Sequence, residues 1–207
     1  MTDPATAPKR VVVLASGAGS TLQALLDAAA DPSYGVVVAA VGTDRPTAGA
    51  VDRARAAGVT TFVAPVGADR AAWDADLADQ VASFEPDLVV SAGFMRLAGP
   101  EFLARFAGRY VNSHPALLPS FPGMHGARDA VAYGVKVSGC TVHFVDEHLD
   151  AGPIIVQRTV EVREDDDAST LAARILEQEH GAYVEALGKL AAGYRVEGRR
   201  VVFDVGR

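Results

Sequence analysis

Three polar residues in two short segments have side chains that could act together in catalysis. Asn112 and His114 stand two positions apart after an apolar run, and Asp150 lies in a later segment rich in turn-forming residues. An amide can bind an oxyanion, an imidazole can move a proton, and a carboxylate can orient the imidazole and favour its charged form. This combination suits transfer of an acyl or one-carbon group to an amine. Each residue also has a plainer interpretation, since Asn can cap a turn and Asp can form one.

Apolar runs alternate with longer amphipathic segments along most of the chain. Short continuous apolar runs are typical of strands buried on both faces of a parallel sheet, and the segments between them predict helices. Gly58 is well placed to end the second helix. Strands are predicted at 11–15, 36–41, 61–64, 88–92, 110–112, 139–145 and 154–162, helices at 21–30, 48–57, 70–84, 100–106, 127–133 and 168–192, and a small hairpin turns at 197–198.

This alternation predicts an α/β fold, namely a single-domain, Rossmann-like, open and mostly parallel twisted sheet with helices on both faces. In such sheets, ligands bind beyond the carboxyl ends of the strands. Residues 1–9 are expected to be a disordered lead-in, and residues 10–207 to be the domain itself. Four polar segments fall at predicted strand ends and are therefore expected to meet in one cleft: 16–21, 93–96, 112–114 and 146–150.

The segment from Gly17 to Thr21 joins the first predicted strand to the first helix. Glycine allows close approach of the backbone, and the free N–H groups at a helix start favour a phosphate, so a phosphate monoester is the preferred ligand. A dinucleotide-binding loop is an alternative because Asp44 lies at a suitable distance for a ribose-binding acid, although Leu22 replaces the third glycine. The P-loop pattern fails for lack of Gly-Lys-Ser/Thr. A turn in which Ser20 or Thr21 caps the helix is the plainest alternative.

Composition excludes several classes of protein. The 207 residues are 49% hydrophobic and 22% charged, an ordinary globular balance. A net charge of −7 without a Lys/Arg cluster argues against a nucleic-acid partner. No run of about 18 apolar residues is present, so no membrane span is expected. The N-terminal residues lack the apolar core of a signal peptide, which indicates a cytoplasmic protein.

The remaining groups that could bind a metal or react have structural interpretations. Cys140 is the only cysteine and lies in an apolar run, which predicts a buried thiol and neither a disulfide nor a Cys-based zinc site. The acidic run 165–167 precedes the long helix and is interpreted as its cap. His143 and Trp73 are interpreted as packing residues, with support of the site as a second role for His143. No metal is expected.

Five motifs in a fixed order give the sequence a specific resemblance. Together they resemble phosphoribosylglycinamide formyltransferases, the folate-dependent enzymes of purine synthesis, over nearly the whole chain. The motifs are Ser-Gly-Ala-Gly-Ser-Thr-Leu-Gln at 16–23, Ala-Gly-Phe-Met-Arg at 92–96, Asn-Ser-His-Pro-Ala-Leu-Leu-Pro-Ser-Phe-Pro-Gly at 112–123, Thr-Val-His-Phe-Val at 141–145 and Leu-Asp-Ala-Gly-Pro-Ile at 149–154.

The resemblance implies transfer of the formyl group of 10-formyltetrahydrofolate, a co-substrate, to the amine of glycinamide ribonucleotide, without a metal and in a homodimer. It assigns catalysis to Asn112, His114 and Asp150. It places the ribonucleotide at Gly19, Ser20, Thr21, Gln178 and Glu179, and the folate at Arg70, Met95, Arg96, Leu97, Ala98, Asn112, Asp146, Glu147, His148, Leu149 and Asp150. The matching bond in the family also makes Leu118–Pro119 a candidate for cis geometry.

The sequence departs from the family pattern at two places. Ala18 and Thr21 replace two asparagines that are frequent in the glycine loop, which leaves the backbone donors in place but changes side-chain contacts. Leu97–Ala98 replaces a bulkier apolar pair, which would loosen the folate pocket slightly.

Three other functions share features with the function that the resemblance implies. 10-Formyltetrahydrofolate hydrolases have the same three catalytic residues but follow an N-terminal regulatory domain, and only about ten residues precede the first predicted strand here. Methionyl-tRNA formyltransferases add a C-terminal domain and a basic surface, which this acidic chain does not match. A folate- or nucleotide-binding module without turnover belongs to another class, and the complete Asn–His–Asp set argues against it.

Overall fold

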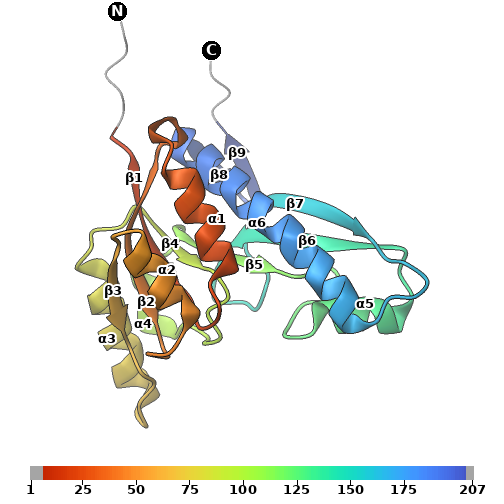
Figure 1. Cartoon of the computed structure of the whole chain (residues 1–207), viewed down its shortest axis with the longest axis horizontal. Coiled ribbons are helices and arrows are strands. Elements are labelled where there is room, and N and C mark those ends of the chain that lie inside the picture. The colour runs from red at the N-terminus through yellow and green to blue at the C-terminus, as the bar shows by residue number, and fades with distance from the viewer. Residues whose placement is uncertain (1–6, 204–207) are drawn as a thin grey trace, which may run out of the picture.

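The computed structural model describes residues 7–203, whose strands form one nine-stranded sheet (Figure 1). The order across the sheet is β3-β2-β1-β4-β5-β6-β7-β9-β8. The strands are β1 (Lys9–Leu14), β2 (Val36–Thr43), β3 (Thr60–Val63), β4 (Leu88–Ser91), β5 (Tyr110–His114), β6 (Val137–Phe144), β7 (Ile154–Glu161), β8 (Tyr194–Glu197) and β9 (Arg200–Phe203). The helices are α1 (Ser20–Ala29), α2 (Gly49–Ala56), α3 (Arg70–Ala82), α4 (Pro100–Arg105), α5 (Gly126–Tyr133) and α6 (Ala168–Ala192), with a 3-10 turn, η1 (Pro32–Tyr34).

Most of the sheet is parallel. Strands β3, β2, β1, β4 and β5 all run in one direction, whereas β6 is antiparallel to both of its neighbours, β5 and β7. At the far edge, β9 pairs in parallel with β7 and forms a hairpin with β8. The central strands are apolar on both faces, as the fully buried side chains of Val11, Val12 and Val13 show, because helices cover both sides. The predicted mostly parallel α/β sheet is therefore confirmed.

Helices cover both faces of the sheet (Figure 1). One buried cluster joins α1, α2, α5 and α6 to one face, with Leu25, Ala54 and Tyr183 among its members. The other cluster joins α3 and α4 to the opposite face through residues such as Leu77 and Phe102. Side chains of consecutive strand residues point to opposite faces and therefore enter different clusters. On β5, this alternation determines the face on which each polar side chain lies.

The predicted elements are all present, with shifts of one or two residues at most of their ends. The long helix has the predicted bounds, 168–192. Strand β5 continues two residues beyond the predicted end, to His114, so His114 lies within the strand and does not follow it. Strand β1 begins at Lys9, one residue before the expected start of the domain, and residues 1–6 of the expected lead-in lie outside the described residues.

Two structural interpretations of polar and sulfur-containing residues are confirmed. Asp167 is the N-cap of α6, where its carboxylate accepts from two backbone N–H groups and Thr170 completes a capping box. Asp166, the residue before this cap, forms an ion pair with Arg174 of α6. Cys140 is fully buried in the core. These groups therefore belong to a helix cap, an ion pair and the core.

Trp73 on α3 is also a packing residue, as predicted. Its side chain is buried, and its indole N–H donates to the carbonyl of Ala64 at 2.9 Å. The indole stacks on Phe94 with ring centroids 6.4 Å apart, and the Arg70 guanidinium lies 4.3 Å from the centre of the indole. Trp73 thus connects α3 to the segment that follows β4. Among residues 7–203, no helix is long and apolar enough to cross a membrane.

Candidate active site

One face of β5 and β6 carries most of the polar side chains of the candidate site. Asn112 and His114 are two residues apart on β5, so they project from the same face. Across the strand pair, Asn112 is opposite His143 and His114 is opposite Thr141. Because directly opposed residues share a face, these four side chains are neighbours. The sheet therefore brings together two residues that were predicted to be catalytic and one that was interpreted as support.

The His114 imidazole is buried between two hydrogen-bond acceptors. Its Nε2 lies 2.7 Å from the carbonyl oxygen of Phe121, and its Nδ1 lies 3.4 Å from Oδ2 of Asp150. A carbonyl and a carboxylate can only accept, and a neutral imidazole has one N–H. Its Nε2 therefore faces a neutral acceptor, and its Nδ1 faces a carboxylate.

Both acceptors belong to residues whose backbone is in the left-handed region. Phe121 has φ 52° and Asp150 has φ 51°, and only one other non-glycine residue among those described, Glu85, has a positive φ. This conformation is unfavourable for a residue with a Cβ and persists where the surroundings enforce it. The backbone N–H of Gly123 donates to Asp150 Oδ2 at 2.7 Å and thus ties the two loops together.

Asp150 does not reach His114 from the carboxyl end of a parallel strand. Since β6 is antiparallel to β5, its last residue, Phe144, lies opposite Val111 near the start of β5. The loop at 145–153 therefore leaves from that end and returns along the face of the site to place Asp150 beside His114. Asp150 thus lies beside His114 because the loop folds back along the sheet.

His143 lies on the other side of the Asp150 carboxylate. Its Nδ1 is 2.9 Å from the carbonyl oxygen of Phe144, to which it donates. Its Nε2 is buried without a hydrogen-bond partner among residues 7–203 and faces Oδ1 of Asp150 at 3.8 Å. Burial lowers the pKa of His143 and outweighs the opposing effects of the Phe144 carbonyl and Asp150. A neutral His143 supports the site without adding charge to it, in line with the second role considered for it.

The proline-rich loop that supplies the Phe121 carbonyl is anchored to β6 and β7. The Leu118–Pro119 peptide is cis, as the resemblance suggested. The hydroxyl of Thr141 accepts from the N–H of Leu118 at 3.0 Å and donates to the carbonyl of Ala116 at 2.7 Å. The Gln157 amide donates to Thr141 and to the Leu118 carbonyl. A buried hydroxyl therefore holds the loop beside His114.

The glycine loop has the geometry of an anion site at a helix start. Gly19 is the N-cap of α1 with φ 75°, and a Cβ there would lie 2.7 Å from Cα of Ala50 on α2. Within the described residues no side chain caps α1, so the capping turn considered for Ser20 or Thr21 is wrong. The start of α1 therefore lacks a side-chain acceptor, and the helix dipole favours an anion there.

Helix α6 brings one of its two predicted substrate residues to this loop. Glu179 lies against the hydroxyls of Thr21 and Ser113; burial raises its pKa, and these two hydroxyls lower it in part. The next residue, His180, lies 3.1 Å from the Ser20 hydroxyl through Nε2. The neighbouring Gln178 lines a separate small pocket with other residues of β7 and α6. Only Glu179 of the pair is shown to face the glycine loop.

The segment 93–99 follows β4 and contains four residues predicted to bind folate. Met95 and Leu97 are 67% and 75% exposed, which is unusual for large apolar side chains beside a polar cluster. Arg70 donates to the Leu97 carbonyl at 3.0 Å, so this predicted residue holds the segment in place. Arg96 is paired with Asp44, which is buried. Both oxygens of Asp44 are engaged, so it is not a free ribose-binding acid, and the dinucleotide alternative has no support.

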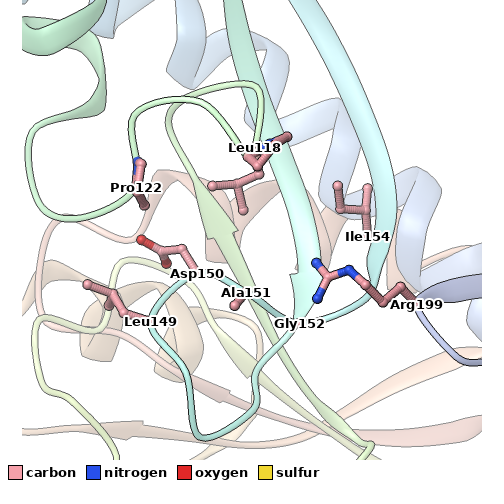
Figure 2. A pocket seen from close by; sticks show the side chains of 9 residues that line it. Leu118, Pro122, Leu149, Asp150, Ala151, Gly152, Ile154 and Arg199 are labelled. Carbon is pink, nitrogen blue, oxygen red and sulfur yellow. The ribbon is translucent and has the colours of Figure 1, made fainter.

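A pocket of about 520 Å³ opens beside Asp150 (Figure 2). Its lining includes Leu118 and Pro122 of the proline-rich loop, Leu149 of the 145–153 loop and Ile154 of β7. Arg199, from the turn between β8 and β9, also lines this pocket and was not predicted as a site residue. Its position depends on a long-range strand pairing, for which the sequence gives no local signal.

The folate residues that were predicted from the resemblance thus lie in two places. Asp150 and Leu149 line the pocket, while the 93–99 segment does not. Asp146 accepts from the N–H of His148 at 2.9 Å and shapes the loop between them, and Glu147 is exposed. Among residues 7–203, no group of three or more His, Cys, Asp or Glu side chains could hold a metal ion.

Known proteins are similar to this chain in sequence and in fold. Residues 9–187 match the family model described as formyl transferase. The chain is 52% identical to phosphoribosylglycinamide formyltransferase of Mycobacterium tuberculosis (strain H37Rv), covering 95% of this chain and 92% of the relative. The crystal structure of glycinamide ribonucleotide transformylase 1 from Symbiobacterium toebii superimposes with a TM-score of 0.91 at 44% identity, over 95% of this chain and 94% of that one.

A more distant solved structure has a different activity in its name. The formyltetrahydrofolate deformylase from Pseudomonas putida KT2440 superimposes with a TM-score of 0.85 at 26% identity, over 98% of this chain and 72% of that chain. The fold alone therefore does not separate the two activities, but the sequence identities do separate the groups. The chain belongs to the formyl transferase family, within its phosphoribosylglycinamide formyltransferase members.

Proposed function

We propose that the site transfers the formyl group of 10-formyltetrahydrofolate to the amine of glycinamide ribonucleotide in purine biosynthesis, with Asn112, His114 and Asp150 as its catalytic residues. The observation that carries the assignment is the His114 imidazole held between the Phe121 carbonyl and the Asp150 carboxylate. The ring is thereby fixed in position next to Asn112 on the same strand face. An imidazole and an amide placed side by side are suited to a reaction in which an oxyanion develops.

The ribonucleotide binds with its phosphate at the glycine loop. Gly19, Ser20 and Thr21 present backbone N–H groups at the start of α1, which suits a phosphate monoester. Glu179 lies beside Thr21, close enough to the loop to receive the hydroxyls of the attached ribose. This arrangement supports a ligand whose phosphate lies at the end of β1 and whose amine reaches toward β5.

The folate binds between the two segments predicted for it. Both carry exposed apolar side chains, Met95 and Leu97 on one and Leu149 on the other. A flat heteroaromatic ring can cover such side chains, and backbone groups of the 146–150 loop are available to its polar edge. The residues present therefore fit a folate co-substrate.

The transfer step uses all three catalytic residues. The amine nitrogen bonds to the formyl carbon, and the C=O electron pair moves to the oxygen, where Asn112 and His114 donate to the oxyanion. The C=O bond then forms again as the bond from the formyl carbon to the folate nitrogen breaks, and that nitrogen takes a proton from His114. The proton lost by the attacking amine returns to His114 through a water held by Asp150.

This step requires His114 to change one hydrogen-bond partner. Its Nε2 lies 2.7 Å from the Phe121 carbonyl oxygen, and its Nδ1 lies 3.4 Å from Oδ2 of Asp150. The carboxylate is needed to stabilise the charge, so the Phe121 carbonyl is the acceptor that the formyl oxygen replaces. The exchange conserves the number of hydrogen bonds and places the stronger acceptor, the oxyanion, on the imidazolium.

A coupled assay tests the proposal. The loss of 10-formyltetrahydrofolate is followed with and without glycinamide ribonucleotide, and the formylated ribonucleotide is identified by mass spectrometry. Transfer predicts folate turnover only with the ribonucleotide present, in equal amounts with the formylated product. The second candidate function is hydrolysis of 10-formyltetrahydrofolate, which the likeness to the Pseudomonas putida deformylase favours. Folate turnover without the ribonucleotide, with release of formate, would support it.

A homodimer and a cytoplasmic location complete the proposal. Both rest on the resemblance to the family and on the composition of the chain. Light scattering after size-exclusion chromatography measures the mass against the 21.5 kDa of one chain. A measured mass near that of one chain at all protein concentrations would contradict the proposed homodimer.

A further inference from the structure

Asp44 has a buried carboxylate immediately after β2, between the two proposed substrate sites. Its side chain is fully buried, and its oxygens accept from the Ser16 hydroxyl at 2.6 Å and from the Arg96 Nε at 2.7 Å. Burial opposes ionisation of Asp44, but the bonds from Ser16 and Arg96 outweigh it and lower its pKa. Arg45 is a more distant cation, with Nε 3.8 Å from the same carboxylate. Burial of a charged carboxylate costs free energy of desolvation. The groups that Asp44 binds therefore indicate what its charge is needed for.

Ser16 connects this carboxylate to the glycine loop. It follows β1 and directly precedes Gly17, the first residue of the loop. Its hydroxyl donates to Asp44 and accepts from the backbone N–H of Met95 at 2.9 Å. Its own N–H donates to the carbonyl of Gly93 at 3.2 Å. One residue thus joins the start of the proposed phosphate site to the start of the 93–99 segment.

The 93–99 segment is held near its middle by these bonds, and the Arg70 bond to the Leu97 carbonyl follows directly after them. Met95 and Arg96 are consecutive, and the first is bound to Ser16 while the second is bound to Asp44. The C-terminal half is fixed from α3, where Asp74 accepts from the N–H of Gly99 at 2.5 Å. The side chains of Met95 and Leu97 are exposed and make no comparable anchor. The position of Met95 and Arg96 therefore depends on Ser16 and Asp44.

We propose that Asp44 is a positioning residue that couples the two substrate sites, so that the ribonucleotide and the folate each raise the affinity of the protein for the other. The inference rests on the proposed function, which places phosphate at 19–21 and folate at 95–98. A phosphate that orders the glycine loop also orders Ser16, and Ser16 with Asp44 holds the backbone that receives the folate. Coupling of this kind is reciprocal by thermodynamic necessity.

Calorimetry measures the coupling directly. Tetrahydrofolate, which carries no formyl group to transfer, is titrated into the full chain with and without saturating glycinamide ribonucleotide. The ratio of the two dissociation constants is the coupling factor, which we expect to be about fivefold or more for the wild type. The reverse titration must give the same factor.

Asp44→Asn tests the role of the carboxylate. The substitution keeps the size of the side chain and removes its charge and one of its two acceptors. We expect the coupling factor to fall toward 1, and the Kd of tetrahydrofolate in the ternary complex to rise by about tenfold. KM for the folate should rise more than kcat falls, because Asp44 does not touch the reacting atoms. Asp44→Glu, which keeps the charge, should restore part of the coupling.

The control is Asp79→Asn, which removes another Asp–Arg ion pair, an exposed one with Arg105 that joins α3 to α4. It should leave the coupling factor at the wild-type value even if the melting temperature falls. If Asp44→Asn does not fold, Ser16→Ala, which breaks the same connection from the other side, replaces it. A wild-type protein that transfers formyl groups but shows no coupling overturns the inference, as does Asp44→Asn or Ser16→Ala with unchanged coupling. Absence of formyl transfer by the wild type would instead contradict the proposed function.

Discussion

Asp150→Asn separates a catalytic carboxylate from a turn residue. Asn has nearly the same shape, and it adopts the left-handed backbone of this position at least as readily as Asp, so the fold should be retained. The carboxylate lies 3.4 Å from the His114 ring, and both side chains are almost fully buried. At this distance and an effective dielectric constant of about 20, the attraction is about 5 kcal/mol before the cost of burial.

If about 3–4 kcal/mol of this attraction stabilises the imidazolium in the transition state, Asp150→Asn lowers kcat by a factor of about 10²–10³. Steady-state assays with both substrates saturating measure this loss, and separate titrations should show that both ligands still bind. Asp129→Asn, which removes an exposed carboxylate beside Arg128 on α5, is the matched control and should keep normal turnover. A near-normal kcat for Asp150→Asn would mean that Asp150 only shapes its loop, and the proton-transfer scheme would be wrong.

Four other substitutions test separate parts of the site. Asn112→Ala and His114→Ala should each lower kcat by about 10²–10³ with smaller changes in ligand affinity, and a wild-type-like kcat in either variant would contradict the oxyanion role. Gly19→Ala places a Cβ 2.7 Å from the Ala50 Cα at φ 75°, so calorimetry should show weaker ribonucleotide binding with folate binding retained; equal loss of both would indicate general misfolding. Burial raises the pKa of Glu179, so its contribution to stability is present at low pH and is lost as pH rises through that pKa. Glu179→Gln should therefore melt above the wild type by a margin that grows as pH rises, while KM for the ribonucleotide increases; a margin independent of pH would refute this.

The sequence was most informative where local patterns decide structure. The valine-rich runs predicted the central strands because burial on both faces requires apolar side chains throughout, as Val11 and Val12 show. The acids at 165–167 predicted the start of α6, since capping is a local property. The glycine loop predicted an anion site for the same reason, because its N–H groups belong to adjacent residues.

Contacts between distant residues were beyond such reasoning. Asp44 suited a ribose-binding acid by its spacing, but its partners Ser16 and Arg96 are 28 and 52 residues away and meet it only in the folded sheet. Arg199 reaches the pocket because β9 pairs with β7, which no local pattern indicates. Likewise, His143 could be placed on a strand from the sequence, but its closeness to Asp150 depends on the antiparallel direction of β6.

The stacking of Trp73 on Phe94 gives the protein a built-in optical signal. Trp73 is the only tryptophan in the chain, so all indole emission comes from one place. Its ring contacts Phe94 of the 93–99 segment and lies beneath the Arg70 guanidinium, which also holds the Leu97 carbonyl. Any ligand that shifts this segment changes the surroundings of the indole. Stopped-flow fluorescence of the unlabelled protein can therefore follow ordering of the segment in real time and show whether it precedes or follows the binding of the second substrate.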